Sequence, residues 1–296
     1  MQEKPIELRS YLILLALSIV WGSSFILIKK ALIAFQPVDL ACMRIAISAL
    51  AFAPILYIKR KAVPWKAWKI FLAVGLTGSG IPAFMYFIAQ TNINSTVSGL
   101  LNSLTPIWTL IIGIIVFKNK TISTQIIGVI IGFLGASLLI LLGESKGTNA
   151  NIWYGLFVVF GTLCYGMSGN LVKHYFQNVD SLIISAVSFC LIGGPAIGYL
   201  IYCGALTGLE WTQEQTFSFG AVMILSLVGT VLATIVFYRL IQETTAVFGS
   251  SVAYVMPLVA MGWGFLDGEP IGLVIILSMV LILTGVYLIK KPATRK

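Results

Sequence analysis

The chain has 296 residues, of which 58% are hydrophobic and 10% are charged, and its formal net charge is +9. Soluble domains carry about 25% charged residues, so this composition excludes a soluble globular protein. The positive charge does not indicate nucleic-acid binding, because the basic residues lie in short loops between apolar runs. The composition predicts an all-α, polytopic membrane protein, since its apolar runs are long enough to cross a hydrocarbon core of about 30 Å.

Ten apolar runs of membrane-spanning length follow one another along the chain. We expect spans at residues 11–28, 40–58, 69–90, 95–117, 123–142, 152–175, 181–203, 217–241, 246–265 and 271–289. The first run is followed by Lys29 and Lys30 without a small-residue cleavage site, so it is expected to stay as a span. The four cysteines have no metal-site spacing. We therefore expect no metal and no cofactor.

The basic residues predict how the spans are oriented. With a cytoplasmic N-terminus, fifteen of the nineteen Lys and Arg residues fall in cytoplasmic segments. Only Lys29, Lys30 and Lys146 fall outside, and Arg44 lies within span 2. This excess follows the positive-inside rule. We expect a multi-pass protein of a bacterial cytoplasmic (inner) membrane, with both termini in the cytoplasm.

A polar loop at 144–151 divides the ten spans into two sets of five. Residues 21–24 (W-G-S-S) in span 1 are similar to residues 165–168 (Y-G-M-S) in span 6, and Pro106 in span 4 corresponds to Pro257 in span 9. These matches indicate a duplication. Because five is odd, two such repeats in series must lie antiparallel across the bilayer, as inverted repeats do in secondary transporters.

The duplication predicts the organisation of the whole chain. We expect a cytoplasmic tail at 1–10, a first five-helix repeat at 11–143, an external linker at 144–151, a second repeat at 152–289, and a basic cytoplasmic tail at 290–296. A substrate site is expected near the membrane midplane, where the inverted halves meet. Two near-equivalent packings of these halves, one open to each side, would give alternating access.

Several short motifs lie at the ends and midpoints of the predicted spans. They are W-G-S-S-F at 21–25, Arg44 in span 2, Tyr86 and Gln90 in span 3, Pro106 in span 4, and Gly268-Glu269 after span 9. Together they resemble the drug/metabolite transporter (DMT) superfamily, and most closely its EamA-type ten-span exporters. The resemblance covers about 11–289. It implies export of small metabolites such as amino acids, through a cavity lined mainly by spans 1, 3, 4, 6, 8 and 9.

One departure from that family is visible. Its Gly-Glu pair usually also follows the fourth span, and here Phe117-Lys118 occupies that place. Since the pair lies in a turn between helices, we expect the departure to affect loop structure more than transport.

No Asp or Glu lies in the interior of any predicted span. Proton-driven efflux of cations usually needs a membrane-embedded carboxylate, so a neutral or zwitterionic substrate, moved by exchange or down its gradient, fits better. The one histidine, His174, and the missing acids leave no nucleophile–base pair or metal-ligand set for an intramembrane enzyme. We expect a metabolite transporter and not an enzyme, with a lipid flippase or a channel-like facilitator as the alternative.

Candidate substrate-binding residues are the polar and aromatic side chains at membrane depth. They are Trp21, Ser24, Asn102, Trp108, Asn170 and Tyr254. Pro106 cannot donate to the carbonyl of Asn102, and Pro257 cannot donate to that of Ala253, so both carbonyls are expected to be free acceptors. For the two asparagines the alternative is hydrogen bonding between helices. For the aromatic residues the alternative is plain packing.

Gate candidates come from the repeat. Tyr86 and Tyr238 are repeat equivalents near opposite membrane faces, and each is followed four residues later by a glutamine, Gln90 or Gln242. We expect these four residues to form an outer and an inner gate. The tyrosines are the main candidates.

Arg44 lies on the outer side of span 2. It is expected either to extend to the headgroups, toward Asp39, or to attract a substrate carboxylate at the outer mouth. In span 5, Gly128 and Gly132 allow close helix approach, either within the chain or at a dimer face. The expected partners are a small-molecule substrate and membrane lipids, with no nucleic acid, and the protein is expected to be a monomer or a dimer.

Overall fold

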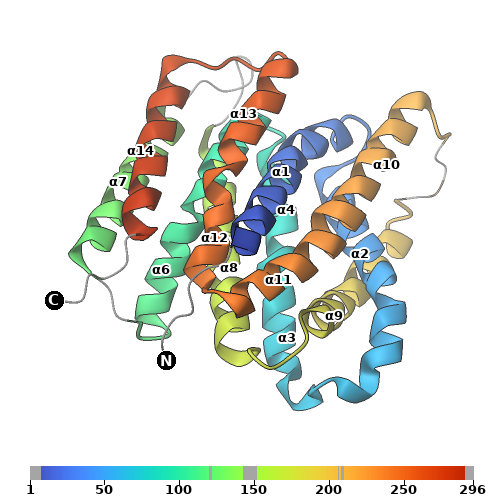
Figure 1. The fold of residues 1–296 in the computed structure, drawn as a ribbon. Helices are drawn as coiled ribbons and strands as arrows, with labels where there is room; N and C mark the ends of the chain where they lie inside the picture. Colours follow the sequence, from blue (N-terminus) through green and yellow to red (C-terminus); the bar gives the residue numbers. More distant parts are fainter. Residues whose placement is uncertain (1–7, 120–121, 143–151, 206, 208–209, 291–296) are drawn as a thin grey trace.

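The protein is a bundle of membrane-length helices (Figure 1). The structure, a computed structural model, describes residues 8–119, 122–142, 152–205, 207 and 210–290. Six of the crossings in this part of the chain are single helices. They are α1 (Leu8–Ala31), α2 (Pro37–Lys59), α7 (Ser123–Leu142), α8 (Gly155–Tyr175), α9 (Ser181–Tyr202) and α14 (Leu273–Lys290).

The number and length of the helices confirm the predicted class. Among the described residues, nine helical segments are long and apolar enough to cross a membrane, and Leu273–Leu288 forms a shorter apolar helix. The protein is therefore an all-α, polytopic membrane protein of about ten helices. The expected linker at 144–151 and most of the two expected tails, 1–7 and 291–296, lie outside the described residues.

Spans 4 and 9 are each broken near the middle by a 3-10 turn. The segments are α5 (Ser95–Leu101), η4 (Asn102–Leu104) and α6 (Thr105–Ile115), and then α12 (Ala246–Ser250), η7 (Ser251–Tyr254) and α13 (Met256–Leu266). Pro106 and Pro257 lie in the first turn of α6 and α13, where a helix does not use the backbone N–H that proline lacks. The same break therefore occurs at the same place in both halves.

Spans 3 and 8 each contain a π-helical segment. The segments are α3 (Trp68–Gly75), η3 (Leu76–Gly80) and α4 (Ile81–Ala89), and then α10 (Gln213–Ser226), η6 (Leu227–Leu232) and α11 (Ala233–Glu243). An irregularity in span 3 follows from two glycines and a serine before Pro82. The one in span 8 was not expected, because Gly229 alone is a weak signal there. Such π segments are frequent at functional sites.

The second spans of the two halves, α2 and α9, pack side by side in opposite directions. At one end, the Tyr199 hydroxyl donates to Asp39 at 3.2 Å. At the other end, Lys59 forms an ion pair with Asp180, just before α9. The start of each helix thus lies against the end of the other.

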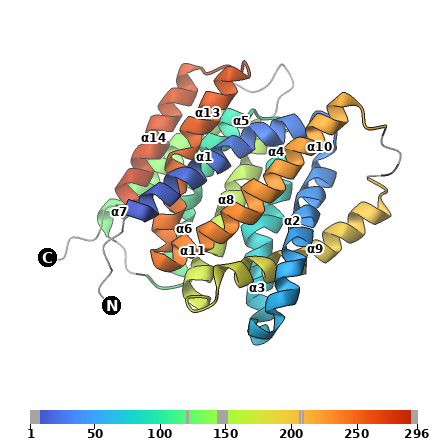
Figure 2. The ribbon, with the colours of Figure 1, turned by 45° about the vertical axis from the view of Figure 1, so that its right-hand side comes forward.

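The last spans, α7 and α14, form the second antiparallel pair, at the opposite side of the bundle from α2 and α9 (Figure 1, Figure 2). A Cβ atom at Gly285 would lie 2.5 Å from both the Gly128 carbonyl oxygen and the Gly132 nitrogen. One at Gly135 would lie 2.8 Å from the Ile282 nitrogen. Backbones this close require glycine, so the Gly128 and Gly132 pair serves packing within the chain.

We predict that Gly285→Ala will lower the stability of the protein by about 1–3 kcal/mol, because the new methyl group would overlap backbone atoms that cannot move aside. Thermal unfolding of the purified protein in detergent measures the change. Gly262→Ala in α13 is the matched control, because a Cβ there meets no atom within 4 Å. It should leave stability unchanged or raise it, since alanine is the better helix former. Equal effects of the two substitutions would contradict this account of the α7–α14 contact.

The first spans of the halves lie in the centre of the bundle. Helix α1 packs against α10 and α13, and α8 packs against α4 and α6. Figure 2 shows α1 passing between α13 and the α10–α11 span. In both cases the first span of one half contacts the third and fourth spans of the other. Exchanging the halves therefore leaves the packing pattern unchanged.

Candidate functional site

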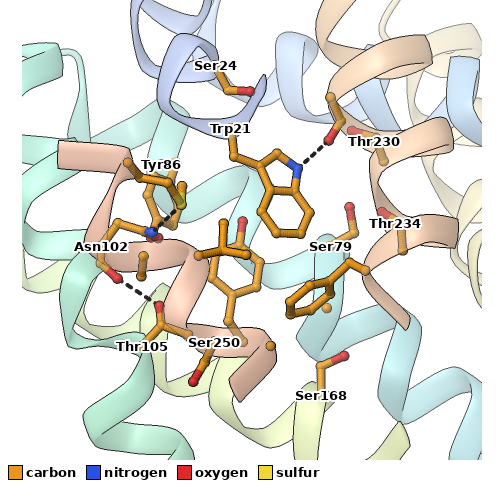
Figure 3. Close-up of a pocket in the computed structure, with 18 of the residues that line it drawn as sticks. Trp21, Ser24, Ser79, Tyr86, Asn102, Thr105, Ser168, Thr230, Thr234 and Ser250 are labelled. Carbon is orange, nitrogen blue, oxygen red and sulfur yellow. Dashed lines mark hydrogen bonds between the residues drawn. The ribbon is translucent and has the colours of Figure 1, made fainter. Parts of the chain in front are cut away.

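A cavity lies where the two halves meet. It encloses about 840 Å³ of empty space, counting the part open to the surroundings. Spans 1, 3, 4, 6, 8 and 9 contribute to its wall, as the family resemblance implies, and span 2 adds Arg44. Figure 3 labels ten lining residues: Trp21, Ser24, Ser79, Tyr86, Asn102, Thr105, Ser168, Thr230, Thr234 and Ser250.

Trp21 and Ser24 place α1 in the wall of the cavity, as the sequence predicted. The Trp21 indole points between Tyr86 on one side and Thr230 on the other (Figure 3). Its Nε1 donates to the carbonyl of Gly229 in the π segment η6, at 2.7 Å. Trp21 thus connects the first span of one half to the irregular span of the other.

Asn102 also lines the cavity and is 4% exposed. Its side-chain oxygen accepts a hydrogen bond from the Tyr86 hydroxyl, and its Nδ2 lies 3.5 Å from the sulfur of Met256. Because Asn102 is the first residue of the 3-10 turn η4, the break in span 4 places this amide beside the cavity.

The two carbonyls that the prolines leave without a helical donor are both hydrogen-bonded. The Asn102 carbonyl accepts from Thr105 Oγ1 at 2.8 Å, and the Ala253 carbonyl accepts from Ser103 Oγ at 2.9 Å. The expectation of free acceptors was therefore wrong. A hydroxyl side chain donates to each carbonyl, and the Thr105 backbone N–H also donates to the Asn102 carbonyl, so both buried acceptors have partners.

The structure corrects the expected position of Arg44. It is the eighth residue of α2, is 8% exposed, and lines the central cavity. Its Nε donates to Thr230 Oγ1 at 2.9 Å. Extension to the headgroups is therefore wrong, because this face of α2 packs against span 8. The other alternative, attraction of a substrate carboxylate at the outer mouth, stays a prediction. Asp39 is bound instead by Tyr199.

Asn170 does not line the cavity. Its Nδ2 donates to the Thr109 carbonyl at 2.9 Å and to the Gly166 carbonyl at 2.8 Å. These bonds join α8 to α6. The structure therefore favours the alternative of hydrogen bonding between helices, and the predicted binding role is not supported.

Trp108 and Tyr254 are likewise absent from the cavity wall. Trp108 packs edge-on against Phe133 of α7, with ring centroids 5.2 Å apart. The Tyr254 hydroxyl donates to the Val286 carbonyl of α14. Both rings face the α7–α14 pair and not the centre, because the helix breaks turn successive residues to different sides.

The two gate tyrosines line one and the same cavity. The Tyr86 hydroxyl reaches Asn102, and the Tyr238 hydroxyl lies 3.4 Å from Ser168 Oγ. A Cβ at Gly78 would lie 2.6 Å from the Tyr238 oxygen, so this wall is closely packed. The gate role of the two tyrosines stays a prediction.

The gate glutamines lie outside the cavity. Gln90 is buried and its Nε2 lies 3.4 Å from Ser98 Oγ. Gln242 donates through Nε2 to the carbonyls of Phe176 at 2.5 Å and Val179 at 2.7 Å. Gln242 therefore holds the end of span 8 to the α8–α9 connection, and a gating role for either glutamine is not supported.

Sequence reasoning missed most of the hydroxyl groups in the wall, including Ser79, Thr105, Ser168, Thr234 and Ser250. One signal was available. Gly78-Ser79 and Gly229-Thr230 stand at the same positions of spans 3 and 8, with the 151-residue offset that separates the two prolines. A small polar pair repeated at membrane depth marks both π segments.

A buried ion-pair cluster closes one end of α1. The carboxylate of Glu269, in the turn after α13, accepts from Lys29 Nζ at 2.8 Å, from the backbone N–H groups of Ser95 and Thr96 at 3.1 and 3.0 Å, and from both their hydroxyls. Asp267 pairs with Lys29 at 2.5 Å. Glu269 thereby links the end of α1 to the start of α5, where a negative charge is favourable.

The surroundings of Glu269 hold its carboxyl group in the charged form. Burial by itself would raise the pKa, but the hydrogen bonds from Lys29, Thr96 and Ser95 outweigh burial and lower the pKa to about 2. The pKa of Asp267 is lowered as well, because bonds from Lys29 and Lys30 outweigh its burial. This end of the bundle is therefore held by charge.

The corresponding turn in the first half is one residue longer and lacks the carboxylate. Asn119 N donates to the Gly113 carbonyl at 2.9 Å, as Glu269 N donates to the Gly264 carbonyl at 2.8 Å. Lys118 has a φ of 55°, close to the 75° of Gly268. The departure from the family motif thus lengthens the turn by one residue and removes an anion. The expectation that it affects loop structure more than transport stays a prediction.

An apolar helical bundle with a cavity between its two halves, lined by aromatic rings and hydroxyl groups, defines a multi-pass membrane protein. The sequence pattern of the EamA-like transporter family matches residues 8–141 and 152–290. The chain belongs to this family, and it is a membrane transporter.

The chain is similar to several transporters over most of its length, and a solved structure shares its fold. The chain is 24% identical to an uncharacterized transporter of Archaeoglobus fulgidus, over 94% of this chain and 97% of that one. It is 25% identical to the inner membrane transporter YedA of Escherichia coli K12, over 93% and 90%, and 23% identical to the transporter YyaM of Bacillus subtilis, over 95% and 93%. A solved crystal structure, 16% identical over 95% and 96% of the two chains, has the same fold with a TM-score of 0.64.

Proposed function

We propose that this protein is a secondary transporter that exports a small metabolite, such as an amino acid or a similar zwitterionic or neutral compound, across a bacterial cytoplasmic membrane. The observation that carries this proposal is the cavity of about 840 Å³ between the halves, lined by aromatic rings and hydroxyl groups. Its place between the halves is where secondary transporters bind substrate. Both termini would lie in the cytoplasm, and the chain would work as a monomer.

Alternating access between inverted repeats is the mechanism we propose. The antiparallel pairs α2–α9 and α7–α14 support it, because both join equivalent spans of the two halves. So do the breaks in spans 3, 4, 8 and 9, which recur with one offset. Because the two halves have the same fold in opposite orientations, they can exchange conformations. A packing that opens the cavity to one side of the membrane then has an equivalent that opens it to the other side. Tyr86 and Tyr238, which both line the cavity, are the residues proposed to move.

Counterflow in proteoliposomes tests the proposal. Vesicles are preloaded with one candidate metabolite, and uptake of the labelled compound is followed over a panel of amino acids and organic acids. A carrier is expected to show saturable uptake that depends on the preloaded compound. A current that does not saturate would indicate a channel-like facilitator, and movement of labelled phospholipid between leaflets would indicate a flippase. Either result would replace the proposed function.

A further inference from the structure

We propose that Arg44 binds the carboxylate of the transported compound, and that the substrate is a small monocarboxylate which needs no ammonium group. This inference rests on the proposed transport function, because only that function makes the bound anion a substrate. It changes the expected substrate from any neutral or zwitterionic metabolite to an organic acid.

Arg44 places a buried positive charge in the wall of the cavity. Arg44 is 8% exposed and lines the cavity, and it is the one formally charged side chain among the described lining residues. Its Nε bonds Thr230 at 2.9 Å, and Thr230 in turn donates to the Leu225 carbonyl at 2.9 Å. The guanidinium is thus held against the π segment η6 from one side.

Arg44 has no acidic partner within the described part of the chain. The ion pairs within the described part of the chain join Lys29, Lys30, Lys59 and Arg239 to acids, and none of them includes Arg44. A buried charge within a membrane span is costly unless it is paired. An anion that enters the cavity removes that cost, so the site favours anionic ligands over neutral ones.

The guanidinium of Arg44 favours a monocarboxylate over other anions. A guanidinium presents planar donors that match the two oxygens of a carboxylate. A phosphate monoester carries about 1.5 to 2 negative charges at pH 7, and a single arginine would leave part of that charge unpaired in the cavity. A monocarboxylate is neutralised by Arg44 alone. The ring of Trp21, with those of Phe25 and Phe237, would contact an apolar body attached to it.

The ammonium group of an amino acid would need acceptors in the cavity wall. The described lining contains no Asp or Glu. The strongest neutral acceptors nearby already have donors, since Asn102 Oδ1 accepts from Tyr86, and the Asn102 and Ala253 carbonyls accept from Thr105 and Ser103. An ammonium would therefore find neutral oxygens and the faces of aromatic rings, but no charged partner among the described lining residues. A deaminated acid should therefore bind at least as well as the matching amino acid.

Ligand-induced thermal stabilisation of the purified full chain in detergent tests this inference with one matched series. The probes are 3-phenylpropanoate, its amide, phenylalanine, 2-phenylethylamine and 2-phenylethyl phosphate, with short aliphatic carboxylates added. We expect 3-phenylpropanoate to bind about tenfold to hundredfold more tightly than its amide, the range for a charged hydrogen-bonding pair. Phenylalanine should bind no better than 3-phenylpropanoate, and the amine and the phosphate should bind weakly.

Variants assign the effect to one residue. Arg44→Gln should abolish the difference between acid and amide, and Arg44→Lys should keep part of it. Arg239→Gln is the matched control, because it removes an arginine from an exposed ion pair with Glu243, outside the cavity. It should bind the acid like the wild type.

Three results would overturn the inference: equal binding of acid and amide by the wild type, unchanged discrimination in Arg44→Gln, or no binding of any carboxylate. Counterflow separates the two proposals. Carboxylate-selective binding without counterflow would leave the anion site and remove the transport function. Counterflow of amines or amides, unaffected in Arg44→Gln, would keep transport and remove the anion site.

Discussion

Glu269→Gln is expected to lower the free energy of unfolding by about 3 kcal/mol at pH 7, the low end for breaking a buried ion pair. The Glu269 side chain is 2% exposed, and among the residues that the structure describes its oxygens accept from Lys29, Ser95 and Thr96. A glutamine would direct its NH₂ group at donors that also need an acceptor. The effect stays at the low end because Lys29 keeps Asp267, at 2.5 Å.

The same contribution should depend on pH in a defined window. The pKa of Glu269 lies at about 2 in the folded protein, below its usual 4.5. A lowered pKa stabilises the folded state above the usual value, and this stabilisation is lost as pH falls from about 4.5 toward 2. The wild type should therefore approach the stability of Glu269→Gln as the pH falls through this window.

Thermal unfolding in detergent at pH 7 and at pH 3.5 checks both statements. Glu243→Gln is the control, because Glu243 forms an exposed pair with Arg239 at i,i+4. Such pairs contribute about 0.3–0.5 kcal/mol. A Glu269→Gln protein as stable as Glu243→Gln at pH 7 would show that the cluster does not hold α1 to α5.

The second large effect is expected from a pair of asparagines. Asn102→Ala should reduce counterflow by about tenfold to hundredfold, the equivalent of 1.4–2.8 kcal/mol, because it removes an amide from the cavity wall and leaves the Tyr86 hydroxyl without its acceptor. Asn170→Ala should keep counterflow and lose about 1 kcal/mol of stability, since Asn170 joins α8 to α6 outside the cavity.

The two variants control each other, because both asparagines are buried, with 4% and 6% exposure. Counterflow is normalised to the amount of folded protein in the vesicles, and unfolding temperatures are measured on the same preparations. If both variants lose transport in proportion to stability, Asn102 has only a packing role. If Asn170→Ala loses transport without losing stability, the boundary of the site is wrong.

The periodicity of apolar runs was enough to predict the fold class, and motifs such as W-G-S-S-F were enough to predict the family. Membrane spans can be read from sequence because an unsatisfied backbone group in lipid is too costly for anything but a helix. The prolines at 106 and 257 likewise predicted irregular spans, and both spans are broken there.

The same reasoning predicted the residues of the site only in part. Trp21, Ser24 and Asn102 line the cavity as predicted, while Trp108, Asn170 and Tyr254 do not. Depth in the membrane can be read from position in a span, but the direction in which a side chain points cannot be once a 3-10 or π segment shifts the helical register. The predicted positions therefore failed mostly in spans that are broken.

By itself, the amino-acid sequence determined that the chain spans a membrane about ten times, that it is duplicated, and that it belongs to a transporter family. These are consequences of local composition and spacing. Only the tertiary structure decided that Arg44 faces a cavity instead of the headgroups, and that Glu269 caps α5. Both depend on which helix lies opposite, and contacts between residues more than 150 positions apart cannot be read from either segment alone.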